Sequence, residues 1–145
     1  MKIAIGCDPN AQSAKEDLIK YLNDKNYGEI TDFGSEDPIY ANTAITVAKA
    51  VASGEYDRGI LICGTGIGMS IAANKVKGIR CALCSETVSA GLTRAHNDSN
   101  VVAMGARVIG IEVAKAIVET FLSTPFDGGR HARRIDKITE YEKNH

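Results

Sequence analysis

Apolar residues along the chain form short continuous runs, and these runs alternate with longer stretches in which apolar positions recur with helical spacing. The short runs are typical of buried strands, and the longer periodic stretches are typical of helices. Strands are predicted over Lys2–Cys7, Glu29–Phe33, Arg58–Cys63, Ile79–Cys84 and Asn100–Met104. Helices are predicted over Ala14–Lys25, Tyr40–Ser53, Gly68–Lys75, Glu86–His96, Glu112–Leu122 and His131–Lys143.

The alternation of strand and helix is the pattern of βαβ units built around a parallel sheet. Because such crossovers are right-handed and cover both faces of the sheet, the expected fold is a three-layer α/β/α sandwich. Its centre is a five-stranded, parallel, Rossmann-like sheet. The 145 residues contain no repeat, low-complexity tract or linker, so one domain is expected over residues 1–145.

Charge and hydropathy exclude several classes of partner. With 17 basic and 18 acidic residues, the chain has no bulk charge that would attract nucleic acid or a membrane surface. No apolar run approaches the roughly 18 residues that a membrane span needs. The segment Met1–Cys7 is also too short for the apolar region of a signal peptide, so a cytoplasmic protein is expected.

The chain has four cysteines, at positions 7, 63, 81 and 84. Cys81 and Cys84 are three residues apart on a predicted strand, so they point to opposite faces and cannot easily share a metal ion. No second pair with this spacing occurs in the chain. We therefore expect these cysteines to be structural, and no metal site.

In parallel sheets of this kind, ligands bind beyond the carboxyl ends of the strands. That rule selects Asp8 after the first strand, Cys63 at the end of the third, and Ser85–Thr87 after the fourth. Asp8 and Cys63 are expected to meet at one edge of the sheet. The Asp8 carboxylate would either relay protons between substrate oxygens or cap a turn.

The segment Cys63-Gly64-Thr65-Gly66-Ile67-Gly68 joins a strand to the start of a helix. Its three glycines allow a tight turn that directs several N–H groups at one point, where they would hold a phosphate or an oxyanion. A thiol that faces such donors ionises more readily than a free cysteine. The alternative is an ordinary loop that holds a small buried cysteine.

Two later segments are rich in basic groups. His96 ends a predicted helix, where an imidazole either complements the helix dipole or serves as an acid and base. Arg130 and Arg134 are four residues apart, so they share a helix face and can hold one anion, whereas Arg133 is expected to point elsewhere. A solvated basic face is the alternative.

Together these residues resemble the ribose-5-phosphate isomerase B and galactose-6-phosphate isomerase family, over nearly the whole chain. The matching segments are Ile3–Asp8, Gly59–Gly68, Asn74–Lys75, His96–Asp98, Gly105–Arg107 and Gly129–Arg134. The resemblance implies interconversion of ribose 5-phosphate and ribulose 5-phosphate through an enediolate, without a metal or an organic cofactor. It also implies a homodimer, or a homotetramer, whose sites draw residues from both subunits.

The resemblance assigns roles to individual residues. Cys63 is the base that moves a proton between C1 and C2, Thr65 and His96 open the sugar ring, and Asp8 lies near the reacting oxygens. Gly64, Gly66, Ile67, Gly68 and Asn97 are expected to bind the substrate, with the loop amides stabilising the enediolate charge. The phosphate is expected to bind Arg107, Arg130 and Arg134, with His131 nearby and with Arg107 taken from the partner subunit.

One position departs from the family pattern. The family usually continues Cys7-Asp8 with histidine, whereas this chain has Pro9, which offers neither an imidazole nor a backbone N–H, and Asn10 follows it. Allose 6-phosphate, galactose 6-phosphate and a four-carbon ketose phosphate are therefore alternative substrates.

Two other functions are a non-catalytic sugar-phosphate sensor and a nucleotide-binding module, and the spacing of Gly64, Gly66 and Gly68 disfavours the latter.

Overall fold

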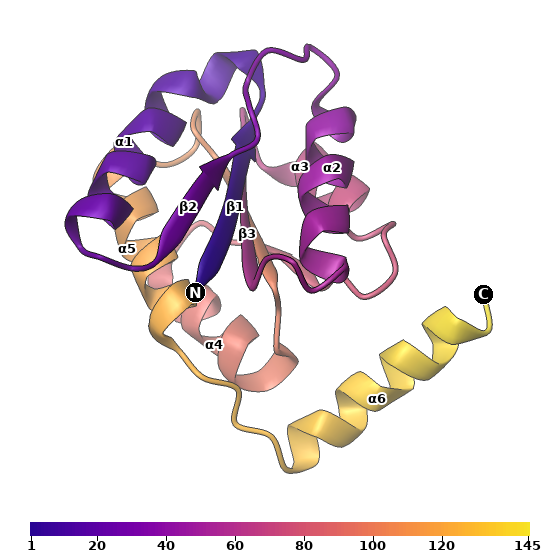
Figure 1. The fold of residues 1–145 in the computed structure, drawn as a ribbon. Helices are drawn as coiled ribbons and strands as arrows, with labels where there is room; N and C mark the ends of the chain where they lie inside the picture. The colour runs from indigo at the N-terminus through magenta and orange to yellow at the C-terminus, as the bar shows by residue number, and fades with distance from the viewer.

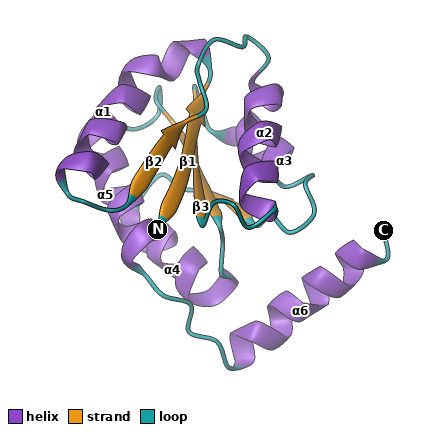
Figure 2. Cartoon of the chain, viewed as in Figure 1, coloured by secondary structure: helices purple, strands orange, loops and turns teal.

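Five parallel strands form the centre of the computed structural model, which describes residues 1–145 (Figures 1 and 2). The strands are β1 (Lys2–Cys7), β2 (Glu29–Asp32), β3 (Arg58–Cys63), β4 (Cys81–Leu83) and β5 (Val101–Gly105). The helices are α1 (Gln12–Asp24), α2 (Tyr40–Ala52), α3 (Ile67–Ala73), α4 (Thr87–Asn97), α5 (Ile111–Ser123) and α6 (Arg130–Lys143). The predicted α/β fold with a five-stranded parallel sheet is confirmed.

Successive residues of each strand enter different cores, which is why the strands read as continuous apolar runs. Ile60 and Ile62 of β3 pack with α1, α4 and α5, whereas Leu61 and Cys63 pack with α2 and α3. Figure 1 shows these two groups of helices on opposite sides of the sheet. Cys63 therefore emerges on the face that α2 and α3 cover.

Cys81 and Cys84 lie on opposite faces of the sheet, as their spacing predicted. Cys84 belongs to the core beneath α4 and α5, and Cys81 packs against the core beneath α2 and α3. Burial raises the pKa of Cys81 to about 12 and that of Cys84 to about 11. Both thiols are therefore protonated and serve in packing, as expected.

The strand order β2-β1-β3-β5-β4 creates a crevice between β1 and β3. Strand β2 pairs with one side of β1, and β3 pairs with the other side. The loops that leave β1 and β3 therefore run in different directions. A short 3-10 helix, η1 (Pro9–Ala11), was not predicted and follows β1 directly. This turn places Asp8 at the edge of the crevice.

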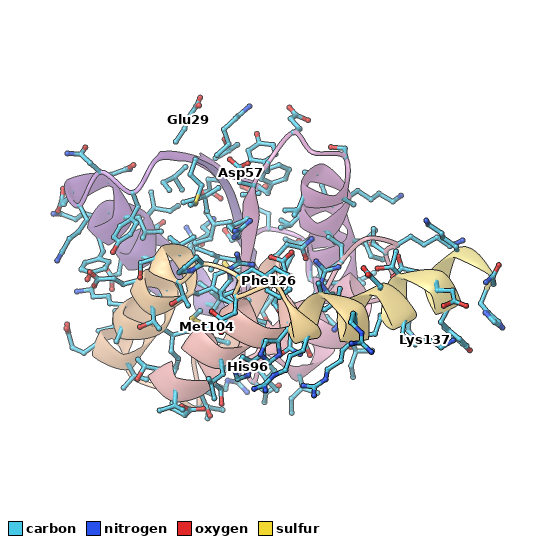
Figure 3. All side chains as sticks on the ribbon, turned by 90° about the horizontal axis from the view of Figure 1, so that it is seen from below. Glu29, Asp57, His96, Met104, Phe126 and Lys137 are labelled. Atoms are coloured by element: carbon cyan, nitrogen blue, oxygen red, sulfur yellow. The ribbon has the colours of Figure 1, made fainter.

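Helix α6 extends away from the sandwich, beyond the amino ends of the strands (Figure 1). Only His131 and Ile135 of this helix are buried, and Ile138 and Tyr141 are exposed. Figure 3 views the molecule from this side and shows His96 close to the first turn of α6. No helix of the structure combines the length and the apolar character needed to cross a bilayer.

Candidate active site

A cavity of about 420 Å³ opens at the carboxyl ends of β1 and β3. It is lined by Asp8, Tyr40, Cys63, Gly64, Thr65, Ile67, Gly68 and Ile71. The predicted meeting of Asp8 and Cys63 at one edge of the sheet is therefore confirmed. The volume is in the range that holds a small metabolite.

The sulfur of Cys63 faces the glycine-rich turn. Cys63 is 5% exposed, and its Sγ accepts a hydrogen bond from the backbone N–H of Gly66 at 3.1 Å. The turn therefore gives the Cys63 sulfur a backbone donor in the cavity that Asp8 and Thr65 also line.

Gly66 has the left-handed φ of +79° that this turn requires. A Cβ at Gly66 would lie 2.7 Å from the carbonyl carbon of Met104 and 2.6 Å from a methyl group of Leu83. No other residue fits without displacing the turn. Next to it, the hydroxyl of Thr65 accepts from the N–H of Ile67 at 3.2 Å and so fixes the start of α3.

Asp8 caps the turn after β1 and also lines the cavity. Its Oδ1 accepts from the N–H of Asn10 at 3.0 Å, and its own N–H donates to the carbonyl of Ile62 at 3.1 Å. Pro9 occupies the first position of η1, where the missing N–H would have had no partner in the helix. The capped turn thus holds the Asp8 carboxylate at the wall of the cavity that Cys63 lines.

Tyr40 is a site residue that the sequence analysis missed. It is the first residue of α2, and its ring covers Gly68 so closely that a Cβ there would lie 2.5 Å from the ring. The rule that ligands bind beyond the carboxyl ends of the strands also selects the loop after β2, which leads to the start of α2.

Arg107 lies beside the Cys63 loop of its own chain. Its N–H donates to the carbonyl of Gly64 at 3.0 Å, and its Cδ lies 3.5 Å from where a Gly64 Cβ would be. The reason is the strand order: β5 pairs with β3, and Cys63 is in register with Gly105. The loops that follow these two strands are therefore neighbours.

His96 and Asn97 lie at the other end of the sheet. They end α4, which runs back toward the amino ends of the strands, and Arg80, just before β4, donates from Nε to the carbonyl of Asn97 at 2.9 Å. Thr65, at the carboxyl end of β3, is thus not brought near His96 within one chain. The predicted ring-opening pair is divided between the two ends of the molecule.

The basic start of α6 joins His96 at this amino end. The rings of His96 and His131 are stacked, with centroids 4.3 Å apart. Burial and the positive charges of His96, Arg130 and Arg134 lower the pKa of His131. Asp127 lies close to both imidazoles, but rings stacked at 11° direct their in-plane lone pairs in parallel and not at a common metal ion.

Arg130, Arg133 and Arg134 line one surface depression of about 350 Å³. The expectation that Arg133 points elsewhere is therefore wrong, because side chains three residues apart also lie on neighbouring parts of a helix surface. The first turn of α6 contains no acidic residue, and none of the three guanidinium groups has an ion-pair partner in the chain. This surface is suited to an anion.

Comparison with known proteins gives a family match over most of the chain. A model of the family described as Ribose/Galactose Isomerase matches residues 3–138. The chain is 50% identical to ribose-5-phosphate isomerase B of Escherichia coli, over 98% of this chain and 97% of that protein. It is 47% identical to D-erythrulose-4-phosphate isomerase of Pectobacterium atrosepticum, over 98% and 95% respectively. The solved structure of ribose-5-phosphate isomerase B of Clostridium thermocellum superposes with a TM-score of 0.94, at 48% identity, over 99% of each chain.

Proposed function

Because the chain belongs to the ribose/galactose isomerase family, we propose that it is an aldose–ketose isomerase that interconverts ribose 5-phosphate and ribulose 5-phosphate. The observation that carries the proposal is the Cys63 sulfur, which accepts the Gly66 N–H in a cavity that Asp8 and Thr65 also line. Those are the groups that a proton transfer between neighbouring carbons requires.

The reaction needs a base beside the carbonyl and donors for the charge that develops. In our proposal the Cys63 thiolate takes the proton from the carbon next to the carbonyl and forms an enediolate. The resulting thiol returns that proton to the neighbouring carbon. In this proposal the amides of Gly64 and Gly68 donate to the enediolate charge, while the Gly66 amide holds the Cys63 sulfur and the Ile67 amide holds Thr65. Asp8 moves the second proton between the two substrate oxygens.

Ring opening and phosphate binding require groups from the other end of the sheet. We infer that a second copy of the chain supplies them: His96 acts with Thr65 on the ring oxygen, and Asn97, Arg130, His131 and Arg134 bind the substrate and its phosphate. Arg107 adds a cation from the chain that carries Cys63. Exposed apolar side chains suit burial against a partner: Ile67 and Ile71 line the cavity, and Leu83 and Val108 line a depression next to it.

The minimal active unit is therefore a homodimer with two composite sites, and a homotetramer would contain two such pairs. We propose the cytoplasm as its compartment. All four cysteines are unpaired, and the Cys63 thiol must stay reduced to act as a base.

A second candidate substrate follows from Pro9. A proline at this position cannot donate a hydrogen bond to the phosphate or to a sugar hydroxyl, and a relative with 47% identity is named for erythrulose 4-phosphate. A four-carbon ketose phosphate, allose 6-phosphate or galactose 6-phosphate is therefore the alternative. Substituting Pro9→His should shift the preference toward ribose 5-phosphate, and an unchanged ranking would remove Pro9 from the explanation.

The experiment that tests the proposal is a panel of these sugar phosphates, assayed for turnover and for deuterium uptake from heavy water at the transferred position. We expect turnover of ribose 5-phosphate by the wild-type chain and turnover about 10²- to 10⁴-fold lower in Cys63→Ala. Binding without turnover or deuterium uptake on any sugar phosphate would favour a non-catalytic sensor and contradict the enzyme.

A further inference from the structure

The turn that follows His96 is held by two arginines. Arg94, on α4, donates from Nη1 to Oδ1 of Asp98 and to the carbonyl of Ser99, both at 2.8 Å. Arg80 donates from Nη2 to the carbonyl of Asp98 at 2.9 Å and to its Oδ2 at 3.4 Å. Through Nε, Arg80 also binds the carbonyl of Asn97. Both carboxylate oxygens of Asp98 are thus occupied.

The backbone of Asp98 is unusual for a residue with a side chain. Its φ of +46° is left-handed, and its N–H donates to the carbonyl of Arg94 and so closes the last turn of α4. Glycine ends helices in this conformation without steric cost. Aspartate adopts it less easily, so its side chain must contribute something that ending the helix does not require.

The carboxylate balances a buried excess of positive charge. Arg94 is 3% exposed, and the half-buried Arg58, which lies within electrostatic reach of Arg94 and Asp98, has an Nε without a hydrogen-bond partner. Asp98 is the acidic group shared by Arg80 and Arg94, and Asp57, the other acid near Arg58, accepts the N–H of Lys2. Without Asp98, Arg94 and Arg80 would lose their common partner, and the turn that carries Asn97 and His96 would loosen.

We propose that Asp98, held between Arg80 and Arg94, is a positioning residue that fixes His96 and Asn97 for the ring-opening step. The inference rests on the proposed function, in which His96 acts on the ring oxygen of the aldose. The segment before α6 is held by a bond outside this cluster, because the N–H of Asp127 donates to the carbonyl of Ala95 at 2.9 Å. Phosphate binding is therefore maintained when Asp98 changes.

The two substrates separate ring opening from proton transfer. A five-carbon aldose phosphate enters as a ring, whereas the corresponding ketose cannot close a five-membered ring because its O5 carries the phosphate. Exchange of the ketose C1 proton with heavy water therefore needs the Cys63 end of the site but not His96. Conversion of aldose to ketose needs both.

The test is Asp98→Asn, because asparagine tolerates the same left-handed backbone and loses only the charge. We expect aldose turnover to fall about 10- to 100-fold, as for a catalytic group displaced by about 1 Å, while deuterium exchange into the ketose changes by less than about twofold. Asp98→Gly relieves the backbone and removes the carboxylate, and it should behave in the same way. Of two variants at Arg80, Arg80→Lys keeps the positive charge beside Asp98 and should retain more turnover than Arg80→Gln.

Asp24→Asn is the matched control, because Asp24 forms a similar i,i+4 pair with Lys20, 2.8 Å long, far from His96. Neither rate should change in this variant. The inference would be overturned if aldose turnover and ketose exchange fell together in Asp98→Asn and Asp98→Gly. It would also be overturned if aldose turnover did not fall in these variants. A wild-type chain that neither turns over nor exchanges any sugar phosphate would instead refute the proposed function.

Discussion

At the carboxyl end of the sheet the polar groups are held by backbone, whereas at the amino end they are carried by side chains of two helices. The Cys63 sulfur is 5% exposed and bound to an amide in a turn that only glycine permits. By contrast, Arg130, Arg133 and Arg134 are exposed and have no acidic partner. The carboxyl end thus holds its sulfur in a fixed position, whereas the amino end offers three exposed guanidinium groups to an anion.

The difference shows what each end lacks. The carboxyl end has a thiol bound to an amide, with Arg107 as its nearby cation, and the amino end has several cations but no thiol. A sugar phosphate needs both sets of groups within its own short length. This arrangement is explained if the carboxyl end of one chain and the amino end of a second chain together form one site.

The largest effect is expected at the sulfur. Cys63→Ala should lower turnover about 10²- to 10⁴-fold, because the base of the proton transfer is lost. Cys7 ends the neighbouring strand β1, and burial raises the pKa of its thiol to about 11, so Cys7→Ala is the matched control. Steady-state kinetics on both variants should show loss in the first only. Equal losses would mean that Cys63 acts through packing.

The next effect tests the backbone of the same end. Gly66→Ala should lower turnover about 10²- to 10³-fold, because the added methyl group meets Met104 and displaces an amide donor. Gly54 has a similar φ of +85° with nothing within 4 Å of its Cβ position, so Gly54→Ala carries the strain without the clash. Comparing kcat and the unfolding temperature of the two variants separates catalysis from strain. If Gly54→Ala lost as much turnover, the amide donor would not be the cause.

A smaller effect is expected at the amino end. Arg134→Gln should raise KM about tenfold or more with a smaller change in kcat, because a charge-assisted contact to the phosphate is lost. Lys137→Gln, one turn further along α6, removes a cation that pairs with Glu140 and should leave KM unchanged. KM values for the two variants provide the check. Equal increases would indicate only a general attraction by the basic face.

The smallest effect concerns pH and stability. The pKa of His131 is lower in the folded chain than its ordinary value, mainly through burial and the neighbouring cations, so the unfolded chain binds a proton first as the pH falls. The His131 contribution therefore lowers stability as the pH falls through the ordinary histidine range near about 6.5. Thermal unfolding between about pH 5.5 and 7.5 should show a weaker pH dependence in His131→Gln than in the wild type. If the unfolding temperature depended equally on pH in both proteins, His131 would not be the cause of the pH dependence.

The sequence predicted β1 and β3 to the residue, because both are buried on two faces and read as uninterrupted apolar runs. The edge strand β4 is shorter than its predicted range, since Ile79 instead closes a turn by donating its N–H to Val76. Strand boundaries at a sheet edge depend on neighbours that local apolar character does not reveal.

The site was predicted where it follows from strand direction and missed where it follows from strand order. Asp8 and Cys63 share an edge because both follow parallel strands, and any order that pairs β1 with β3 gives this result. The position of Arg107 beside the Cys63 loop was not predicted, because the pairing of β5 with β3 cannot be known from local pattern. His96 is far from Thr65 because α4 runs back toward the amino ends of the strands. The predicted order of strand and helix already implied this direction, but the family resemblance paired the two residues without regard to it.

The composite site is tested most directly by combining two inactive variants. Cys63→Ala and His96→Gln should each be inactive alone, and each damages a different end of the sheet. Co-expressed in equal amounts, they should recover about a quarter of wild-type turnover, because about half of the dimers are mixed and each mixed dimer has one intact site. A mixture as inactive as its parents, with mixed dimers present, would show that one chain supplies the whole site.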